Sequence, residues 1–175
     1  MKALLVSIAL VAICGVVDAA PGESTKKALE LIAQSRHAEA AQLLDPLAKA
    51  GDADAQYHLA LLHYAGKGVP ENERKAVELL KSSAERGNVN AMYQLGNAFT
   101  FGNETPRFVA DADVEAAQWY YRAAKLGNAD AQYSLGLLFM AGKGLEKNPK
   151  EATYWMQEAA KNGHKDAKSY VSGRK

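Results

Sequence analysis

The chain repeats one stretch of its own sequence, and this repetition constrains the fold more than any other feature. GDADAQYHLALLHYAGKGV begins at Gly51, and a close copy of it, NADAQYSLGLLFMAGKGL, begins at Asn128. A more divergent copy, which includes GNAFTFGNET from Gly96, lies between them. Small repeated units cannot bury their own apolar side, so a pattern of this kind is typical of folds in which neighbouring units stack.

Alignment of the copies defines columns of apolar and glycine residues, and the spacing of these columns locates an insertion. The spacing is 36 and then 40 residues in the first half of the copies, and 40 and then 36 in the second half. The columns of the first half are Leu59, Leu95 and Leu135, and Gly66, Gly102 and Gly142. The columns of the second half are Ala76, Ala116 and Ala152; Leu79, Trp119 and Trp155; Ala84, Ala124 and Ala160; and Gly87, Gly127 and Gly163. The middle copy therefore has a four-residue insertion within NETPRFVADADV, and this segment around Phe108 is either an extension of a binding surface or a tolerated surface loop.

Each copy is predicted to form two helices. In its first half, apolar residues recur at helical spacing, and Asp52 or Asp54 can cap the start of the helix in the first copy. Gly66 is placed to end that helix. In the last copy, NPKE places Asn148 as the cap of the second helix, and Gly163 follows the end of this helix. The sequence therefore predicts an all-α fold of stacked antiparallel helix pairs.

The same frame divides the rest of the chain. Residues 24–52 are predicted to be a shortened N-terminal helical repeat, because they fit the columns of the second helix but lack the glycine loop. Full repeats are expected at 53–88, at 89–128 with the insertion, and at 129–164. Residues 165–175 restart a helix and then become polar and basic, as expected of a capping helix that faces water.

The N-terminal segment has the pattern of a signal peptide. Lys2 precedes an apolar run at 3–17, and these 15 residues are fewer than the roughly 20 that a membrane-spanning helix needs. We expect residues 1–19 to be removed by cleavage after Ala19, which leaves a periplasmic or secreted protein without stable membrane insertion. The alternatives are an uncleaved anchor or a lipoprotein, but Ile13 is too large for the position before the lipid-bearing Cys14. The mature chain then contains no cysteine and can form no disulfide.

The charge balance argues against nucleic acid and against an anionic membrane surface as partners. The chain has 21 basic and 20 acidic residues, and its pI is about 7.8. Binding to either polyanion usually requires a basic surface.

The columns resemble the Sel-one-like (Sel1-like) repeat, a relative of the tetratricopeptide repeat. The resemblance rests on ADAQYSLG, GKGL and ATYWMQEAAKNG in the last copy, and it extends over most of the chain after the N-terminal segment. The sequence departs from the family pattern at Ala60, Met92 and Glu104. The resemblance implies an α/α solenoid with a concave inner surface. It also implies that the protein acts as an adaptor that binds another protein.

The resemblance to tetratricopeptide repeats also implies which residues face the concave side. These are Tyr57, Leu61, Tyr64, Tyr93, Asn97, Thr100, Tyr133, Leu137 and Met140. A surface of aromatic residues and methionine suits protein binding, in which a few side chains usually provide most of the free energy. The alternative is that the tyrosines only pack between repeats.

No catalytic, cofactor-binding or metal-binding residues are predicted. The GKG loops lack the strand, lysine and hydroxyl of a phosphate-binding loop. His58 and His63 are five residues apart, whereas paired metal ligands on a helix usually lie four apart. STKK at 24–27 matches the serine-x-x-lysine motif of penicillin-recognising enzymes, but the companion motifs do not occur.

The function that these patterns favour is an exported, non-enzymatic scaffold that binds another protein in its concave groove. One alternative is a periplasmic immunity protein that neutralises a secreted antibacterial effector. The other is a cell-envelope hydrolase that acts on β-lactams or peptidoglycan, since members of the resembled family have been linked to β-lactam binding.

Overall fold

A computed structural model describes residues 21–173, which form nine α-helices and one short 3₁₀ helix without any strand. The predicted signal peptide lies outside these described residues. The helices are α1 (Pro21–Ala33), α2 (His37–Lys49), α3 (Ala53–Ala65), α4 (Glu73–Glu85), α5 (Val89–Phe101), η1 (Thr105–Phe108), α6 (Ala112–Lys125), α7 (Ala129–Ala141), α8 (Pro149–Lys161) and α9 (Lys165–Ser172). Of these, α1 already includes residues 21–23, ahead of the predicted boundary at residue 24. None of the helices in this range is long and apolar enough to cross a membrane.

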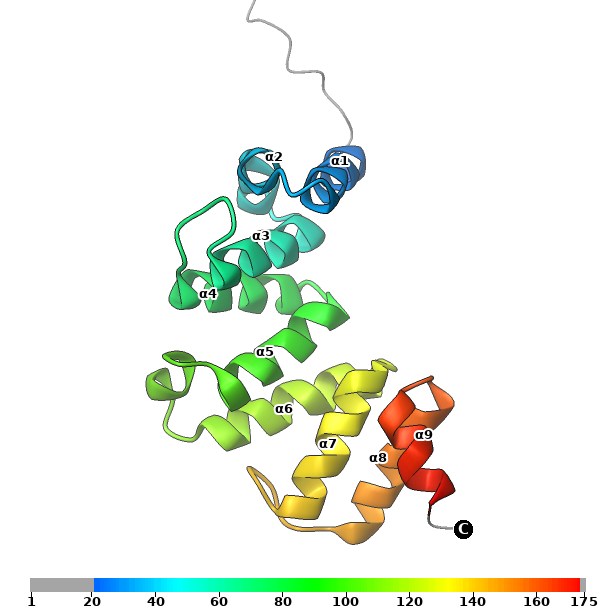
Figure 1. The fold of residues 1–175 in the computed structure, drawn as a ribbon. Coiled ribbons are helices and arrows are strands. Elements are labelled where there is room, and N and C mark those ends of the chain that lie inside the picture. The colour runs from blue at the N-terminus through cyan, green and yellow to red at the C-terminus, as the bar shows by residue number, and fades with distance from the viewer. Residues whose placement is uncertain (1–20, 174–175) are drawn as a thin grey trace, which may run out of the picture.

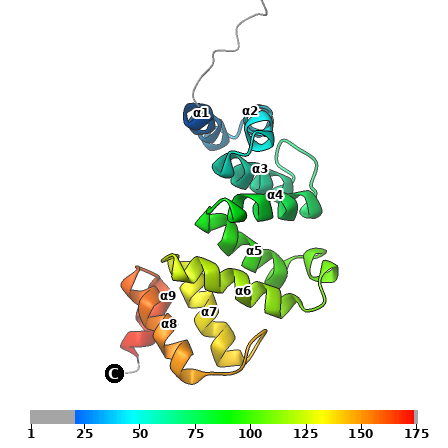
Figure 2. The same cartoon turned by 180° about the vertical axis from the view of Figure 1, so that it is seen from behind.

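The helices pair and stack in chain order, which confirms the predicted solenoid. Each α-helix packs against the next one along the chain, and α5 also contacts α7. The pair α1–α2 forms one end of the stack and α9 lies at the other end, as two opposite views show (Figures 1 and 2). The predicted first helices of the three full repeats are α3, α5 and α7, and the second helices are α4, α6 and α8.

Side-chain caps fix where each first helix begins. Asp52, Asn88 and Asn128 each accept a hydrogen bond from the backbone N–H three residues later, at 2.7, 2.8 and 2.8 Å. The cap in the first copy is thus Asp52 and not Asp54. Because equivalent residues cap all three helices, equivalent positions in the repeats share one orientation.

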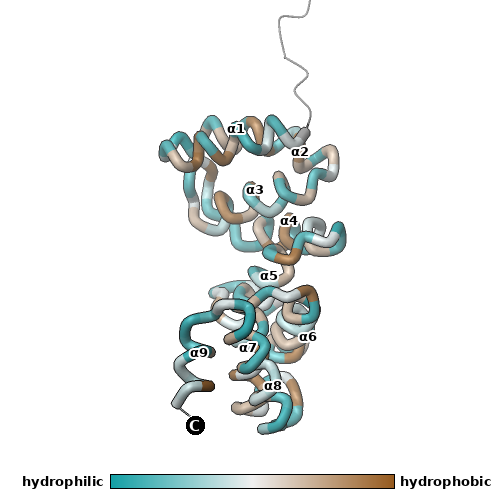
Figure 3. Tube along the Cα trace, turned by 90° about the vertical axis from the view of Figure 1, so that its right-hand side faces the viewer, coloured by the Kyte–Doolittle hydropathy of each residue, from teal (hydrophilic) through white to brown (hydrophobic). Residues whose placement is uncertain are grey.

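The core consists of small and apolar residues at the predicted columns. The leucine column is buried, and so are Trp119, Trp155 and the alanines of the second-helix columns, apart from the half-buried Ala160. Apolar and polar positions alternate along the trace of each helix (Figure 3), because one side of each helix packs against its neighbours while another faces water. Burial of these side chains is the main favourable contribution to folding.

Glycines in the GKG loops let the backbone approach the preceding second helix. Gly68 has φ 72°, and a Cβ atom there would lie 2.4 Å from the backbone N of Ala38 on α2. Gly144 has φ 67°, and its Cβ would lie 1.9 Å from the carbonyl O of Asp113 on α6. These glycines are therefore turn residues that permit close packing, as predicted from the sequence.

The middle loop packs differently, because Glu104 stands where the other copies have this second glycine. The Glu73 carboxylate, at the start of α4, accepts hydrogen bonds from the N–H groups of Asn103, Glu104 and Thr105 at 3.2, 3.1 and 2.7 Å, and also from the Thr105 hydroxyl. Burial raises the pKa of Glu73, but these hydrogen bonds outweigh burial and the pKa is lowered overall. The Glu73 carboxylate thus holds the middle loop in place, whereas in the other two repeats a glycine lets the corresponding loop pack closely.

A glutamine on the first helix joins some of the repeats to the preceding helix. The side-chain amide of Gln56 donates to the carbonyl O of Ala48 at 2.9 Å, and that of Gln132 donates to Ala124 at 3.0 Å. In the middle repeat the same position is Met92, which is buried in the apolar core. The α4–α5 junction therefore depends on apolar packing at this position.

Candidate functional site

The residues predicted for the concave side all remain accessible to solvent. They lie on the first helices, and none of them is buried. Together they define the first-helix face: Tyr57, Leu61 and Tyr64 on α3, Tyr93, Asn97 and Thr100 on α5, and Tyr133, Leu137 and Met140 on α7. The common cap position explains why the three tyrosines occupy equivalent places.

The most exposed members of this face are apolar or aromatic. Leu137 exposes 41% of its surface and Tyr64 exposes 38%. Partial burial and the nearby Glu73 charge raise the pKa of Tyr64, so its hydroxyl is neutral at physiological pH. These side chains can provide contact area to a protein partner without removing a charge from water.

A hydrogen-bonded cluster lies at the centre of the face. The Tyr120 hydroxyl, which reaches in from α6, donates to Oδ1 of Asn97 at 2.8 Å and lies 3.3 Å from the Thr100 hydroxyl. Gly96 makes room for it, because a Cβ atom there would lie 2.5 Å from the Tyr120 ring. The Tyr93 ring packs 5.9 Å from that of Tyr120, centroid to centroid. Asn97 and Thr100 are therefore held in fixed orientations.

Tyr120 is buried, with an exposed fraction of 2%, and burial raises its pKa to about 12. Its role was not predictable from the repeat columns, because the equivalent residues are Leu80 and Met156, which are ordinary core residues. A hydroxyl in an otherwise apolar column was the only available signal.

The two ends of the face differ in how they are covered. At the α3 end, Tyr57 forms a side-chain hydrogen bond with Gln94 of α5, and burial raises its pKa. At the α7 end, the Tyr133 ring stacks on His164 at 4.1 Å between ring centroids. The Tyr170 hydroxyl of α9 donates to the Met140 sulfur at 3.5 Å. Part of the tyrosine column thus also packs between helices, as the alternative interpretation expects.

Phe101 is a further exposed aromatic residue, and it is not among the residues predicted for the concave side. It lies at the end of α5 and exposes 77% of its surface, more than the other large apolar residues of the described chain. The equivalent residues in the other repeats are Ala65 and Ala141. This departure from alanine was the signal that could have identified it.

The histidines and the serine-x-x-lysine segment do not form a reactive cluster. His63 is buried and its Nδ1 lies 3.1 Å from the carbonyl O of Pro70, whereas His58 lies beside the Tyr57 ring. Ser24 and Lys27 lie on α1, at the end of the stack. Between residues 21 and 173 there is no group of three or more side chains that could hold a metal ion.

The family model described as Sel1 repeat matches residues 53–88, 89–128 and 129–164, which together make up more than half of the chain. The chain belongs to the Sel1 repeat family. The relatives of this Sel1 repeat protein include a curated protein, the exopolysaccharide production negative regulator of Rhizobium meliloti (strain 1021). It is 27% identical over 143 residues, covering 75% of this chain and 53% of the relative. The chain thus spans about half the length of this curated relative.

Two solved structures resemble the whole stack. A Sel1 repeat protein from Oxalobacter formigenes superposes with a TM-score of 0.71 at 26% identity, covering 89% of this chain and 45% of the other. A protective antigen present in uropathogenic Escherichia coli strains, which displays an SLR fold, gives a TM-score of 0.76 at 28% identity, covering 89% of this chain and 34% of the other. Membership in the family suggests a protein–protein interaction scaffold.

Proposed function

We propose that this Sel1 repeat protein is an exported, non-enzymatic scaffold that binds a partner protein on the first-helix face. The observation that carries the proposal is the accessibility of this face. Leu137 and Tyr64 are exposed, and Phe101 extends the apolar surface at the end of α5. Exposed apolar side chains on several repeats suit the anchor residues of a protein interface.

The polar cluster gives the face a defined centre. Tyr120 holds the Asn97 side chain through its hydroxyl, so part of the orientation of Asn97 is set before binding. Preorganised polar groups reduce the entropy lost when a complex forms. An apolar surface with a fixed polar centre favours recognition of a specific partner over general adhesion.

The sequence supports export and a role without catalysis. The apolar run at 3–17 has the length of a signal-peptide core. His63 has a structural contact with the Pro70 carbonyl, and His164 caps α9 by accepting from the backbone N–H of Ala167 at 3.2 Å. The curated relative is named for negative regulation of exopolysaccharide production, which describes a regulatory role of that protein.

Site-specific photo-crosslinking in whole cells tests the proposal. A photoreactive residue at Leu137 is expected to capture a partner protein, whereas the same residue at the exposed Gln157 on α8 serves as the control. Leu137→Glu should weaken binding of that partner by about tenfold or more, because it places a charge in the interface. Gln157→Glu should leave binding unchanged.

Equal capture from both positions, or full binding by Leu137→Glu with an intact fold, would refute the first-helix face as the interface. Turnover of nitrocefin or muropeptides by the purified protein, lost on Ser24→Ala, would instead support an envelope hydrolase. Capture of a secreted antibacterial effector at Leu137 would make the scaffold an immunity protein.

A further inference from the structure

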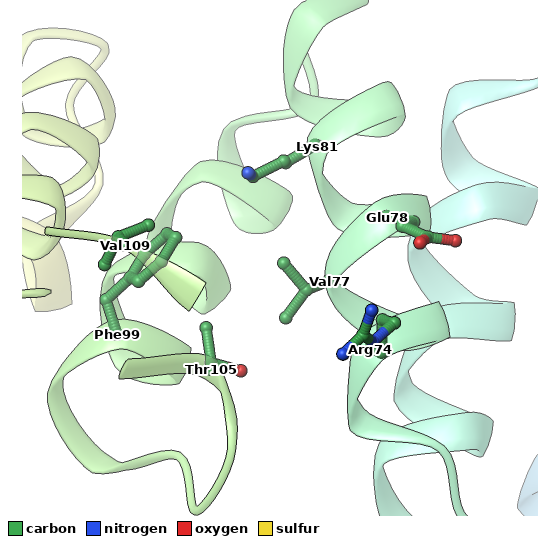
Figure 4. A pocket seen from close by; sticks show the side chains of 7 residues that line it. All are labelled: Arg74, Val77, Glu78, Lys81, Phe99, Thr105 and Val109. Carbon is green, nitrogen blue, oxygen red and sulfur yellow. The ribbon is translucent and has the colours of Figure 1, made fainter. Parts of the chain in front are cut away.

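A second surface lies on α4 and on the side of α5 opposite to Asn97. It is a cavity of about 400 Å³ between α4, the end of α5 and the η1 segment (Figure 4). Phe99 lines this cavity, and it follows Asn97 of the first-helix face by two residues, so the two side chains leave α5 on roughly opposite sides. Lys81 on α4 and Leu137 on α7 can therefore be changed independently.

The floor of the cavity is apolar. Val77 from α4, Phe99 from α5 and Val109 after η1 face one another across it (Figure 4). Val77 and Phe99 are buried and Val109 is half-buried. Thr105 completes the wall, and its hydroxyl is engaged by the Glu73 carboxylate. A cavity of this size and lining suits one apolar side chain of a ligand.

Charged residues flank the apolar floor, and their balance changes from this cavity to the one that adjoins it. Lys81 lies at one end, with its Nζ 5.8 Å from the centroid of the Phe99 ring. At the other end, Arg74 is shared with an adjoining cavity of about 500 Å³. Three carboxylates line that adjoining cavity: Glu71, Glu73 and Glu104. We call the two cavities together the α4 groove; it is basic at the Lys81 end and acidic overall at the Glu73 end.

Glu78 also lines the cavity, but it lies apart from the floor. Its carboxylate is directed away from the floor residues, on the other side of α4 from Phe99 (Figure 4). Arg74 offsets part of the acidic charge, but the carboxylates around it outnumber it.

Comparable cavities at two other junctions have different residues at the position of Lys81. The cavity beside α2 is about 490 Å³ and has Asp45 at the position equivalent to Lys81. The cavity beside α6 is about 360 Å³ and has Tyr121 at that position. Of these three cavities, the one at the middle junction, where the insertion lies, is the one with a basic residue at this position.

We propose that the α4 groove binds an extended segment of a partner protein that carries a basic, an apolar and an acidic side chain at alternate positions. Eight residues of helix separate Glu73 from Lys81, a rise of about 12 Å. In an extended strand, residues i, i+2 and i+4 share one face and span about 13 Å. The basic side chain therefore lies at the Glu73 end, the apolar one on the Val77 floor and the acidic one at Lys81.

This inference goes beyond the proposed function, because it concerns a different surface and states the chemistry of its ligand. Fluorescence anisotropy with the whole chain and labelled synthetic peptides tests it. The first peptide has lysine, leucine and glutamate at alternate positions, separated by serines. One control peptide reverses the order of the two charges, and another replaces the leucine by serine. We expect saturable binding of the first peptide and about tenfold weaker binding of both controls.

Variants of the protein locate the binding. Lys81→Glu should weaken binding of the first peptide about tenfold. The same variant should bind a peptide that has lysine at both charged positions. Lys168→Glu on α9, which changes an exposed lysine elsewhere, should have no effect. Leu137→Glu should also have no effect, which separates this inference from the role of the first-helix face. Circular dichroism confirms that each variant is folded.

Three results would overturn the inference. One is equal binding of the first peptide and its charge-reversed control. Another is unchanged binding of the first peptide to Lys81→Glu. The third is the absence of saturable binding by any of the peptides to the folded chain.

Discussion

Replacement of Glu73 by glutamine tests whether one carboxylate holds the middle loop where a glycine is missing. Glutamine keeps the size of the side chain and one acceptor oxygen, but it removes the charge and turns an NH₂ group toward backbone donors. The lost interactions are charge-assisted hydrogen bonds from Asn103, Glu104 and Thr105, at 2.7 to 3.2 Å. Hydrogen bonds to charged groups contribute about 1.5–3 kcal/mol each, and solvent access reduces this. We expect the free energy of unfolding to fall by about 2 kcal/mol, or about 4–8 °C in Tm.

The pH dependence of this loss identifies the charge as its cause. The pKa of Glu73 is lowered from 4.5 in the folded protein, because the hydrogen bonds from the loop outweigh the effect of burial. A lowered folded-state pKa gives a stability contribution that is fully present above the unfolded-state pKa and is lost as pH falls through the folded-state value. The difference between the native protein and Glu73→Gln should therefore be full at pH 7 and should shrink below about pH 4.5.

Urea unfolding followed by far-ultraviolet circular dichroism at pH 7 and pH 3.5 measures both effects. Glu71→Gln is the matched control, since Glu71 is an exposed carboxylate two residues away and should change stability by less than about 0.5 kcal/mol. The reasoning is wrong if Glu73→Gln behaves like Glu71→Gln, or if its destabilisation is the same at both pH values.

Two further predictions concern the loop glycines and Tyr120. Gly144→Ala should destabilise the fold by more than about 2 kcal/mol, since its Cβ would lie 1.9 Å from the Asp113 carbonyl O. Gly127→Ala, at φ 87° without neighbours within 4 Å, should cost only about 1 kcal/mol, and similar thermal midpoints for the two variants would contradict this explanation. Ultraviolet titration should show one tyrosine that ionises at about pH 12, and this transition should be absent in Tyr120→Phe. The neutral Tyr120 hydroxyl should stabilise the fold below pH 10, and this contribution should be lost as the pH rises toward 12. Tyr120→Phe should also cost about 1 kcal/mol by chemical denaturation through the lost hydrogen bond to Asn97, and a loss near zero would count against that bond.

The solenoid could be predicted because its determinants are local or periodic. The leucine and alanine columns set the buried sides, and Asp52 and Gly66 mark a helix start and end through contacts within a few residues. The ambiguity between Asp52 and Asp54 arose because either residue type can cap. Only the geometry of the chain decides which of two adjacent acids accepts the N–H.

Contacts between helices distant in sequence could not be predicted in the same way. The hydrogen bonds to Glu73 join residues about thirty positions apart. No local sequence pattern indicates that the Glu73 carboxylate would hold the loop in which Glu104 replaces a glycine. Tyr120 aligns with core residues, so its hydrogen bond to Asn97 was invisible in the columns. The accessibility of the first-helix face follows from the repeat register, whereas its binding of a partner stays a prediction.

The glutamine contacts between successive repeats suggest where the solenoid would yield under mechanical load. Gln56 and Gln132 each tie a first helix to the carbonyl end of the helix before it, so these boundaries resist tension through hydrogen bonds. Met92 provides only dispersion contacts at the corresponding boundary. At the α4–α5 boundary the load therefore falls on the hydrogen bonds from the loop after α5 to Glu73, and without that carboxylate a pulling force along the stack should separate it there first.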